Sequence, residues 1–186
     1  MIVVFDFDKT LTQNDTILGF YGFASSKNLI FYLKLLIYYC LVILSKLGFF
    51  SNTSLKKIGV FLFLKNKNKE YLLKKGKMYM KIIPYNEEIL KKLVNHLDSG
   101  DDVYIVTASF CEYVQFFPVN SVKICCSSLR YNHNKVDSLE FNCFGENKVL
   151  LLREKFGVSK IDLLYTDSKS DSSLIEISAK TVWVKK

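Results

Sequence analysis

The chain has 186 residues, of which 49% are hydrophobic and 15% aromatic, so it can bury a hydrophobic core and is not intrinsically disordered. Its net charge is +8, and the positive charge is concentrated between Gln13 and Asn95, where 14 lysines and no arginine stand against 4 acidic residues, a net charge of +10. Arginine is the usual reader of base edges and no nucleic-acid motif is present, which argues against a nucleic-acid-binding protein.

Cysteine usage predicts a reducing compartment. The number of cysteines is odd, no C-x-x-C pair occurs, and a strand pattern begins at Ile2 where a signal peptide would stand. We therefore expect free thiols and a cytoplasmic protein. A cysteine nucleophile or metal cluster is disfavoured because neither His96 nor His133 stands at ligand spacing from a cysteine. The cysteines are Cys40, Cys111, Cys125, Cys126 and Cys143.

The first predicted element is a strand at Ile2–Phe5, a short apolar run typical of a strand covered on both faces. Two aspartates follow it directly. The next segment does not fit a strand-and-helix alternation. It contains two very apolar helical stretches and then a lysine-rich one, and we interpret it as an inserted helical cap. These stretches are Leu29–Phe50, Ile58–Leu64 and Lys65–Lys81.

Alternating strands and helices are predicted after the insertion. Asn86–Leu97 places its apolar residues on one helical stripe and ends at Ser99-Gly100. A strand at Val103–Val106 leads into Thr107-Ala108-Ser109. Further strands are expected at Val122–Cys126, Phe141–Phe144, Ile161–Tyr165 and Thr181–Val184, with a turn at Asn132–Asn134 and a helix at Glu146–Phe156 that Gly157 ends.

This order predicts an α/β fold with a Rossmann-like, doubly wound parallel sheet. We expect residues 1–12 and 85–186 to form the core and residues 13–84 to form the cap. In such sheets the ligand site lies beyond the carboxyl ends of the strands, where three predicted strands end in polar residues. Distant parts of the chain should therefore meet in one crevice.

The residues expected in that crevice indicate phosphoryl transfer. Four carboxylates without a histidine form a set of oxygen ligands suited to Mg²⁺. Two hydroxyls and a lysine at helix starts are groups that bind phosphate. Any one of them alone is more often a turn residue, a helix cap or a surface lysine, so the joint pattern carries the prediction. The carboxylates are Asp6, Asp8, Asp167 and Asp171; the other groups are Thr107, Ser109 and Lys148.

Four short motifs resemble those of the haloacid dehalogenase (HAD) superfamily. FDFDKTLT from Phe5 resembles the first, VTAS from Val106 the second, Lys148 in GENK the third, and TDSKSD from Thr166 the fourth. An insertion between the first and second motifs is similar to the subgroup that includes phosphoserine phosphatases. Thr166 departs from the glycine that many relatives carry before the aspartate.

The resemblance implies a role for each matching residue. Asp6 would be the nucleophile that takes the phosphoryl group, and Asp8 the acid and base. Asp6, the backbone carbonyl of Asp8, and Asp167 would bind Mg²⁺, with Asp171 in support. Thr107 and Lys148 would bind the phosphoryl oxygens, with Ser109 beside them.

The apolar stretch Leu29–Phe50 admits two interpretations. It has only Lys34 and Lys46 as charged residues, and the 11 residues between them span about 16 Å of helix, which is short for a bilayer span. It could form the core of the cap. A helix lying in a membrane interface accounts better for both its hydrophobicity and the net charge of +10 between Gln13 and Asn95.

The predicted function is a Mg²⁺-dependent phosphomonoesterase that acts through an aspartyl phosphate. The insertion and parts of the core also resemble, more loosely, the phosphatidylglycerophosphatase C family, which implies a lipid-linked phosphate. The absence of arginine from the cap argues against a soluble phosphoserine-type substrate, because Arg130 and Arg153 both lie outside it. The alternatives are a soluble metabolite phosphatase, a phosphotransferase, and a non-catalytic binding protein of the same fold.

Overall fold

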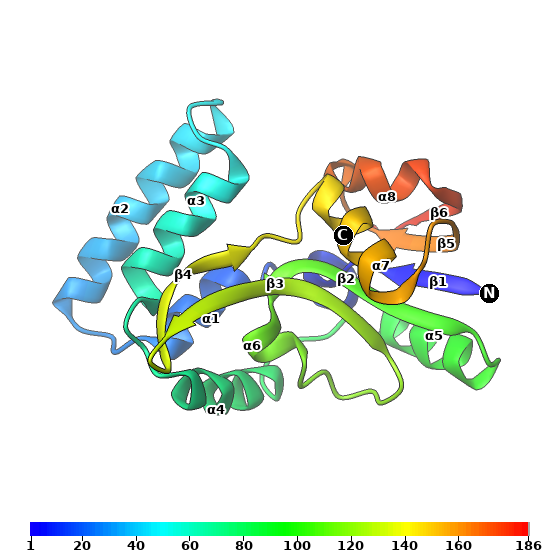
Figure 1. The fold of residues 1–186 in the computed structure, drawn as a ribbon, viewed down its shortest axis with the longest axis horizontal. Coiled ribbons are helices and arrows are strands. Elements are labelled where there is room, and N and C mark those ends of the chain that lie inside the picture. The colour runs from blue at the N-terminus through cyan, green and yellow to red at the C-terminus, as the bar shows by residue number, and fades with distance from the viewer. Residues whose placement is uncertain (186) are drawn as a thin grey trace.

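A computed structural model describes residues 1–185 and contains a six-stranded sheet in the order β4-β3-β2-β1-β5-β6 (Figure 1). All neighbouring strands are parallel except β3 and β4, which form an antiparallel hairpin. The strands are β1 (Ile2–Phe5), β2 (Asp102–Phe110), β3 (Lys123–Asn132), β4 (Lys135–Phe141), β5 (Ile161–Thr166) and β6 (Ser178–Trp183).

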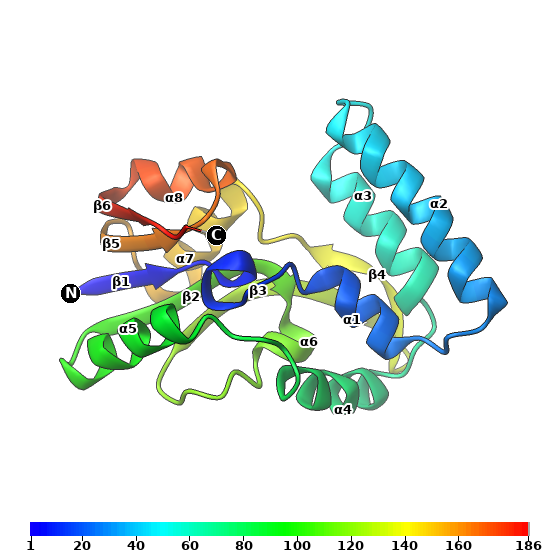
Figure 2. The same cartoon turned by 180° about the vertical axis from the view of Figure 1, so that it is seen from behind.

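Successive residues of β1 pack against opposite layers. Val3 and Phe5 share a core cluster with helix α5 (Glu87–Asp98), whereas Val4 packs with α7 (Glu146–Phe156) and α8 (Ser172–Glu176). This alternation follows from the two-residue period of a strand. Figures 1 and 2 show the helices on the two faces of the sheet. The predicted α/β class and Rossmann-like core are confirmed.

The segment between β1 and α5 is helical and lies beyond the carboxyl ends of the central strands (Figure 2). Asparagine or serine side chains accept a hydrogen bond from a backbone N–H in the first turn of three of its helices, which explains where they begin. Its elements are α1 (Ile17–Ala24), α2 (Leu29–Lys46), α3 (Asn52–Gly59), a short helical turn η2 (Val60–Leu64) and α4 (Lys69–Met80). We call residues 13–84 the cap segment; its status as a separate domain stays a prediction.

Helix α4 packs closely on the short helix α6 (Cys111–Val114) of the core. A Cβ atom placed on Gly76 would lie only 1.9 Å from the backbone oxygen of Glu112. Only glycine therefore fits at this contact without moving one of the two backbones.

Most predicted elements are found within a few residues of their expected bounds, and α7 has the bounds predicted for it. The strand predicted at Phe141–Phe144 is wrong, because the strand that pairs with β3 is Lys135–Phe141. Its hairpin turn contains His133 and Asn134 in the left-handed region, at φ 46° and 66°. The remaining short elements are η1 (Phe7–Leu11) and η3 (Lys169–Asp171).

The expectation of free thiols is wrong for one pair, since Cys111 and Cys126 form a disulfide. The parallel pairing of β2 with β3 places Phe110 opposite Ser127, and it brings the Cα atoms of the two cysteines to 5.2 Å. Cysteines that are 15 positions apart in sequence thus become neighbours. Cys40, Cys125 and Cys143 are free.

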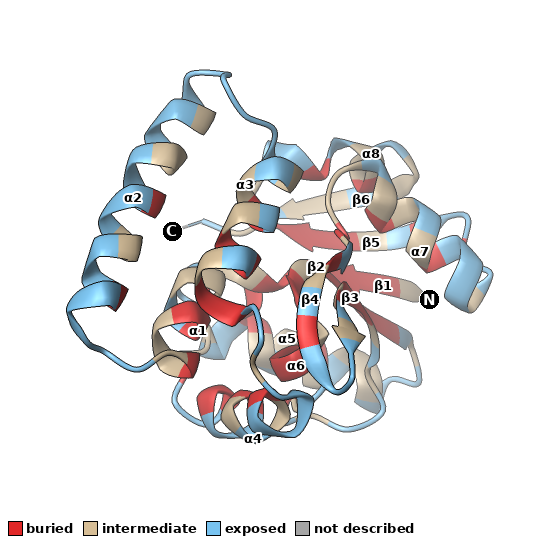
Figure 3. Ribbon diagram, turned by 60° about the vertical axis from the view of Figure 1, so that its left-hand side comes forward, coloured by how far each residue is buried: buried red, intermediate tan, exposed pale blue. Residues whose placement is uncertain are grey.

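Helix α2 carries most of its apolar side chains on the outside (Figure 3). Of its 18 residues only Phe31 and Tyr38 are buried, and both pack against Phe63. Leu36 and Ile43 are 63% and 60% exposed. By length and composition α2 could cross a membrane. The interpretation of this helix as the core of the cap therefore accounts for only a minority of its side chains.

Candidate active site

The carboxyl ends of β1, β2 and β5 meet at one cavity of about 240 Å³. These strands are adjacent in the sheet, so the residues that follow them are neighbours despite their separation in sequence. The predicted convergence of the motifs is therefore found. Predicted site residues that line the cavity are Asp6, Asp8, Thr107, Lys148, Asp167 and Asp171; others include Asp15, Asn52 and Ala108.

A buried lysine joins two of the acidic residues. The Nζ atom of Lys148 donates to Oδ1 of Asp6 at 2.7 Å and to Oδ1 of Asp171 at 2.6 Å. Thr166 donates to the other oxygen of Asp171 at 2.7 Å, so the residue that replaces the usual glycine holds this carboxylate in place. All three charged side chains are almost inaccessible to water.

Burial changes the proton affinities of this group. It raises the pKa of Asp6 to about 7, although the Lys148 ammonium opposes the rise. Burial alone would lower the pKa of Lys148, but Asp6 and Asp171 hold that pKa above its usual range. Lys148 is therefore cationic at neutral pH, beside a carboxylate whose ionisation burial opposes.

Asp8 is held by groups from both the cap segment and the core. Its Oδ1 accepts from the backbone N–H of Thr16 at 2.7 Å and from the Thr16 hydroxyl at 2.6 Å. Its Oδ2 accepts from the Ser109 hydroxyl at 2.5 Å. Burial raises the pKa of Asp8 to about 6, with Asp15 contributing and the hydrogen bonds opposing. A carboxyl group with this pKa suits proton transfer near neutral pH.

The two hydroxyls predicted to bind phosphate occupy different places. Thr107 lines the cavity, and its Oγ1 accepts from the backbone N–H of Ser109. Ser109 is fully buried, is not among the lining residues, and donates to Asp8. The geometry therefore favours Ser109 as a residue that orients Asp8 rather than one that contacts phosphate.

The acidic residues are the right donors for a hard divalent cation. Asp6, Asp8 and Asp167 line one cavity and have only oxygen to offer, which is the ligand that Mg²⁺ prefers. Within residues 1–185, however, no three acidic, histidine or cysteine side chains are close enough together to form a ready metal site. Asp171 is engaged with Lys148 and Thr166. The chemistry of these oxygen donors fits Mg²⁺. Asp171 would support the site through its hydrogen bonds to Lys148 and Thr166.

Two cap residues at this site were not predicted from the sequence. Thr16, at the start of α1, contacts Asp8 as described and also lies 2.7 Å from the hydroxyl of Tyr113. Lys56 of α3 is buried and donates to the backbone oxygen of Ala108, to the Ser127 hydroxyl at 2.7 Å and to Oδ1 of Asn142 at 2.9 Å.

Lys56 thus fixes the cap segment to the backbone beside Thr107. Burial lowers the pKa of Lys56 to about 7, yet its three acceptors match the three protons of the ammonium form. No signal in the sequence marks Lys56 as a buried residue. Its neighbour Lys57 is exposed, and the sequence does not distinguish the two.

Comparison with known proteins agrees with this geometry. The model of the haloacid dehalogenase-like hydrolase family matches residues 3–176. No curated protein sequence matches the chain. A protein of unknown function from Bordetella pertussis Tohama I has a similar structure, with a TM-score of 0.81 and 16% identity over 98% of this chain and 88% of that one.

Two further structures with the same fold are named for phosphoserine chemistry. A phosphoserine phosphohydrolase-like protein from Francisella tularensis subsp. tularensis SCHU S4 has a TM-score of 0.71 and 16% identity over 98% of this chain and 86% of that one. A phospho-aspartyl intermediate analogue of phosphoserine phosphatase has a TM-score of 0.64 and 16% identity, with 97% and 84% covered.

The family match contains all four motifs and nearly the whole sheet. The similar structures cover the cap segment as well as the core, since almost the full chain is aligned. The resemblance expected from the motifs is thereby confirmed, as is the prediction of an enzyme. The chain belongs to the haloacid dehalogenase-like hydrolases.

Proposed function

We propose that the protein is a Mg²⁺-dependent phosphomonoesterase that forms a phosphoryl intermediate on Asp6. The observation that carries this proposal is the buried contact between Lys148 and Asp6 at the edge of a cavity that Asp8 also lines. A carboxylate attacks an anionic phosphate only if nearby cations offset the charge. Lys148 is such a cation, because Asp6 and Asp171 hold its pKa above the usual range for lysine.

Each residue then has a chemical task. The Asp6 carboxylate attacks phosphorus, and the bond to the leaving oxygen breaks. Asp8 in its acid form protonates that oxygen, and as a carboxylate it then takes a proton from the water that hydrolyses the acyl phosphate. Thr16 and Ser109 hold Asp8 in position for both transfers. Thr107 and Lys148 hold the phosphoryl oxygens.

Mg²⁺ bound here would supply positive charge against the phosphoryl oxygens. Asp6, the backbone carbonyl of Asp8, and Asp167 would hold it, while Asp171 positions Lys148. Removal of divalent cations with a chelator should abolish activity and added Mg²⁺ should restore it. Full activity in excess chelator would remove the metal from the mechanism.

The proposed substrate is a phosphate monoester with an apolar tail. The exposed apolar face of α2 and the net charge of +10 between Gln13 and Asn95 complement an anionic membrane surface, so the cap segment would act as a cap domain at the cytoplasmic face of a membrane. A reducing compartment was predicted from free thiols, and the disulfide between Cys111 and Cys126 weakens that prediction. The location at a membrane is therefore proposed only from the exposed apolar and basic surface of the cap segment.

A soluble phosphomonoester is the second candidate. It is favoured by the structures named for phosphoserine phosphatases that share this fold. A phosphate-release screen with soluble monoesters and detergent-dispersed lipid phosphates separates the two candidates. Faster hydrolysis of phosphoserine than of any lipid phosphate would establish the soluble alternative.

Asp6→Asn tests the reaction class itself. The variant keeps the shape of the side chain but cannot attack phosphorus, so release of phosphate from an aryl phosphate should fall at least ~10³-fold. A folded variant with near-normal turnover would contradict the aspartyl-phosphate mechanism. An added alcohol acceptor distinguishes hydrolysis from phosphoryl transfer, and a wild-type protein inactive on every monoester would indicate a binding protein.

A further inference from the structure

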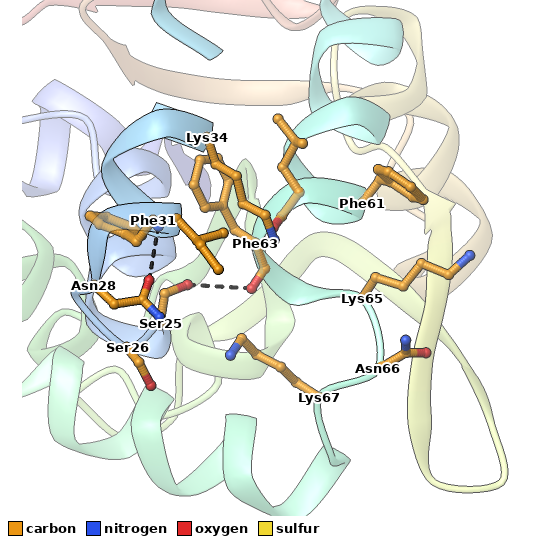
Figure 4. A pocket seen from close by; sticks show the side chains of 12 residues that line it. Ser25, Ser26, Asn28, Phe31, Lys34, Phe61, Phe63, Lys65, Asn66 and Lys67 are labelled. Carbon is orange, nitrogen blue, oxygen red and sulfur yellow. Dashed lines mark hydrogen bonds between the residues drawn. The ribbon is translucent and has the colours of Figure 1, made fainter. Parts of the chain in front are cut away.

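A second cavity, of about 480 Å³, lies within the cap segment. It is formed where the loop after α1 leads into α2 and where η2 leads into α4, as Figure 4 shows. It shares no lining residue with the catalytic cavity. Its lining includes Ser25, Ser26 and Asn28 on one side, and Phe61, Lys65, Asn66 and Lys67 on the other, with Ile30 and Lys34 from α2.

The lining of this cavity has three positive charges and no negative one, because it contains Lys34, Lys65 and Lys67 and no acidic residue. None of the three forms an ion pair within residues 1–185. In Figure 4 the side chains of Lys34 and Lys67 extend into the cavity, whereas Lys65 extends away along its rim. Two ammonium groups therefore share the space without a counter-charge.

Local structure explains part of this arrangement. Lys34 donates to the backbone oxygen of Leu62 at 2.9 Å and so satisfies a carbonyl at the end of η2. Lys65 lies over the ring of Phe61, 5.3 Å from its centre, and Lys67 over that of Tyr71 at 5.5 Å. These contacts place the ammonium groups of Lys65 and Lys67 against aromatic rings, which offset only part of their positive charge.

This arrangement disfavours the charged form of Lys67. Burial lowers its pKa, and the positive charges of Lys34 and Lys75 lower it further. An anion between Lys34 and Lys67 would relieve the repulsion and bind both groups by charge-assisted hydrogen bonds. The exposed hydroxyl of Ser26 is a further donor at the same opening.

The rim of the cavity is apolar. Ile30 and Phe61 both line it and are 61% and 63% exposed. Ile30 continues into the exposed side chains Leu29 and Leu33 of α2. A phosphate group in the cavity would thus have apolar surface directly beside it, which is the arrangement of an anionic lipid at a membrane interface.

We propose that this cavity is a second phosphate-binding site, separate from the catalytic one, that takes the headgroup phosphate of an anionic phospholipid between Lys34 and Lys67. The site does not depend on the catalytic chemistry. It would hold the cap segment at the membrane while a different molecule occupies the catalytic cavity.

The test measures binding without turnover, in an Asp6→Asn background with chelator present. One arm uses vesicles of phosphatidylcholine with and without phosphatidylglycerol, and a second uses sn-glycerol 3-phosphate as a soluble source of the same phosphate. Lys67→Glu should weaken binding to the anionic vesicles at least ~10-fold, as expected when a charge-assisted contact is reversed. Lys67→Arg should keep it.

Lys74→Glu is the matched control, since it reverses one exposed cap lysine outside the cavity. It should weaken vesicle binding several-fold less than Lys67→Glu. Equal losses in the two variants would show that only the overall charge matters and would overturn the site. If glycerol phosphate binds and Lys67→Glu removes that binding, the result supports a phosphate site that takes a soluble source. If neither the vesicles nor glycerol phosphate bind, the proposed site is refuted.

Neither outcome depends on the proposed activity. Lys67→Glu should leave hydrolysis of a small aryl phosphate unchanged in the otherwise wild-type protein, because the two cavities share no residue. An inactive wild-type protein that still bound anionic vesicles through Lys67 would refute the phosphatase and keep the second site.

Discussion

Charged side chains are usually exposed and apolar ones buried. The candidate active site at the edge of the sheet departs from this rule in its charged residues, and helix α2 departs from it in its apolar residues. At the sheet edge, charged groups such as Asp6, Lys148 and Asp171 are buried. On α2, leucine and isoleucine side chains face solvent. The buried charges are bonded to one another, whereas the exposed apolar side chains have few partners in the chain. The charged groups of the first region thus satisfy one another, whereas α2 presents an apolar surface that the described part of the chain leaves uncovered.

The largest effect is expected from removing the cation at the centre of the buried group. Lys148→Met leaves Asp6 and Asp171 buried without compensation, which should lower the free energy of unfolding by about 3 to 5 kcal/mol. It should also reduce phosphate release at least ~10³-fold. Chemical denaturation and a phosphate assay measure the two effects.

Lys160→Met is the control, because Lys160 is exposed and follows the same helix. Its unfolding free energy should stay within about 0.5 kcal/mol of the wild type. A Lys148→Met protein as stable as this control would show that the buried charges do not depend on one another.

Gly76→Ala tests the close contact between the cap segment and the core. Alanine favours a helix by about 1 kcal/mol over glycine. The added Cβ would nevertheless meet the backbone oxygen of Glu112, so we expect a net loss of about 1 to 3 kcal/mol in the free energy of unfolding. The exposed neighbour Lys77→Ala should change stability little, and a stabilised Gly76→Ala protein would show that the helices are free to separate.

Asp6→Asn should show how much the buried carboxylate destabilises the folded protein, through the pH dependence of the unfolding free energy. The pKa of Asp6 is raised in the folded protein from 3.8 to about 7, so the folded state binds more protons between these values and stability falls as pH rises through them. In chelator, the variant should exceed the wild type in unfolding free energy at pH 8, by an amount that shrinks toward pH 4. A difference between variant and wild type that does not change with pH would contradict this assignment.

The smallest effect on stability is expected on α2. Leu36→Glu combined with Ile43→Glu should change the unfolding free energy by less than about 1 kcal/mol, because both side chains are mostly exposed. It should abolish partitioning to anionic liposomes and reduce activity on lipid phosphate, while activity on an aryl phosphate is kept.

Leu150→Glu combined with Met78→Glu adds the same charge at exposed apolar positions outside α2 and should still allow partitioning. Similar losses in both double variants would indicate a general charge effect. A large loss of stability in the α2 variant would instead show that this helix packs against the rest of the chain.

The sequence sufficed for features that depend on local pattern. Continuous apolar runs predicted β1 and β5, and the motifs at their ends predicted the cavity that Asp6 and Asp167 line. Gly157, in the left-handed region at φ 71°, ends α7 at the residue that the sequence predicted. In each case the residues that specify the structure lie within one element or directly after it.

Features that depend on contacts between distant segments were not predicted. The polar alternation of Lys135–Phe141 indicates a strand only when β3 is present to pair with it. The disulfide between Cys111 and Cys126 depends on the register of two strands. Lys56 looks like any basic helix residue until its three acceptors on the core are known.

Two of the contacts between the cap segment and the core differ in how they can come apart. The contact at Gly76 is an interlock of two backbones, and separating it would open a void that water fills poorly. The bonds of Lys56 are polar, and water can replace each of them as α3 moves away. If the cap segment moves, we therefore expect α4 to stay on the core, while α3 moves away from the cavity at the sheet edge and takes α2 with it. Such a motion would open the cavity on the side of Asn52, and the contact of Lys56 with the backbone beside Thr107 would then mark the closed state.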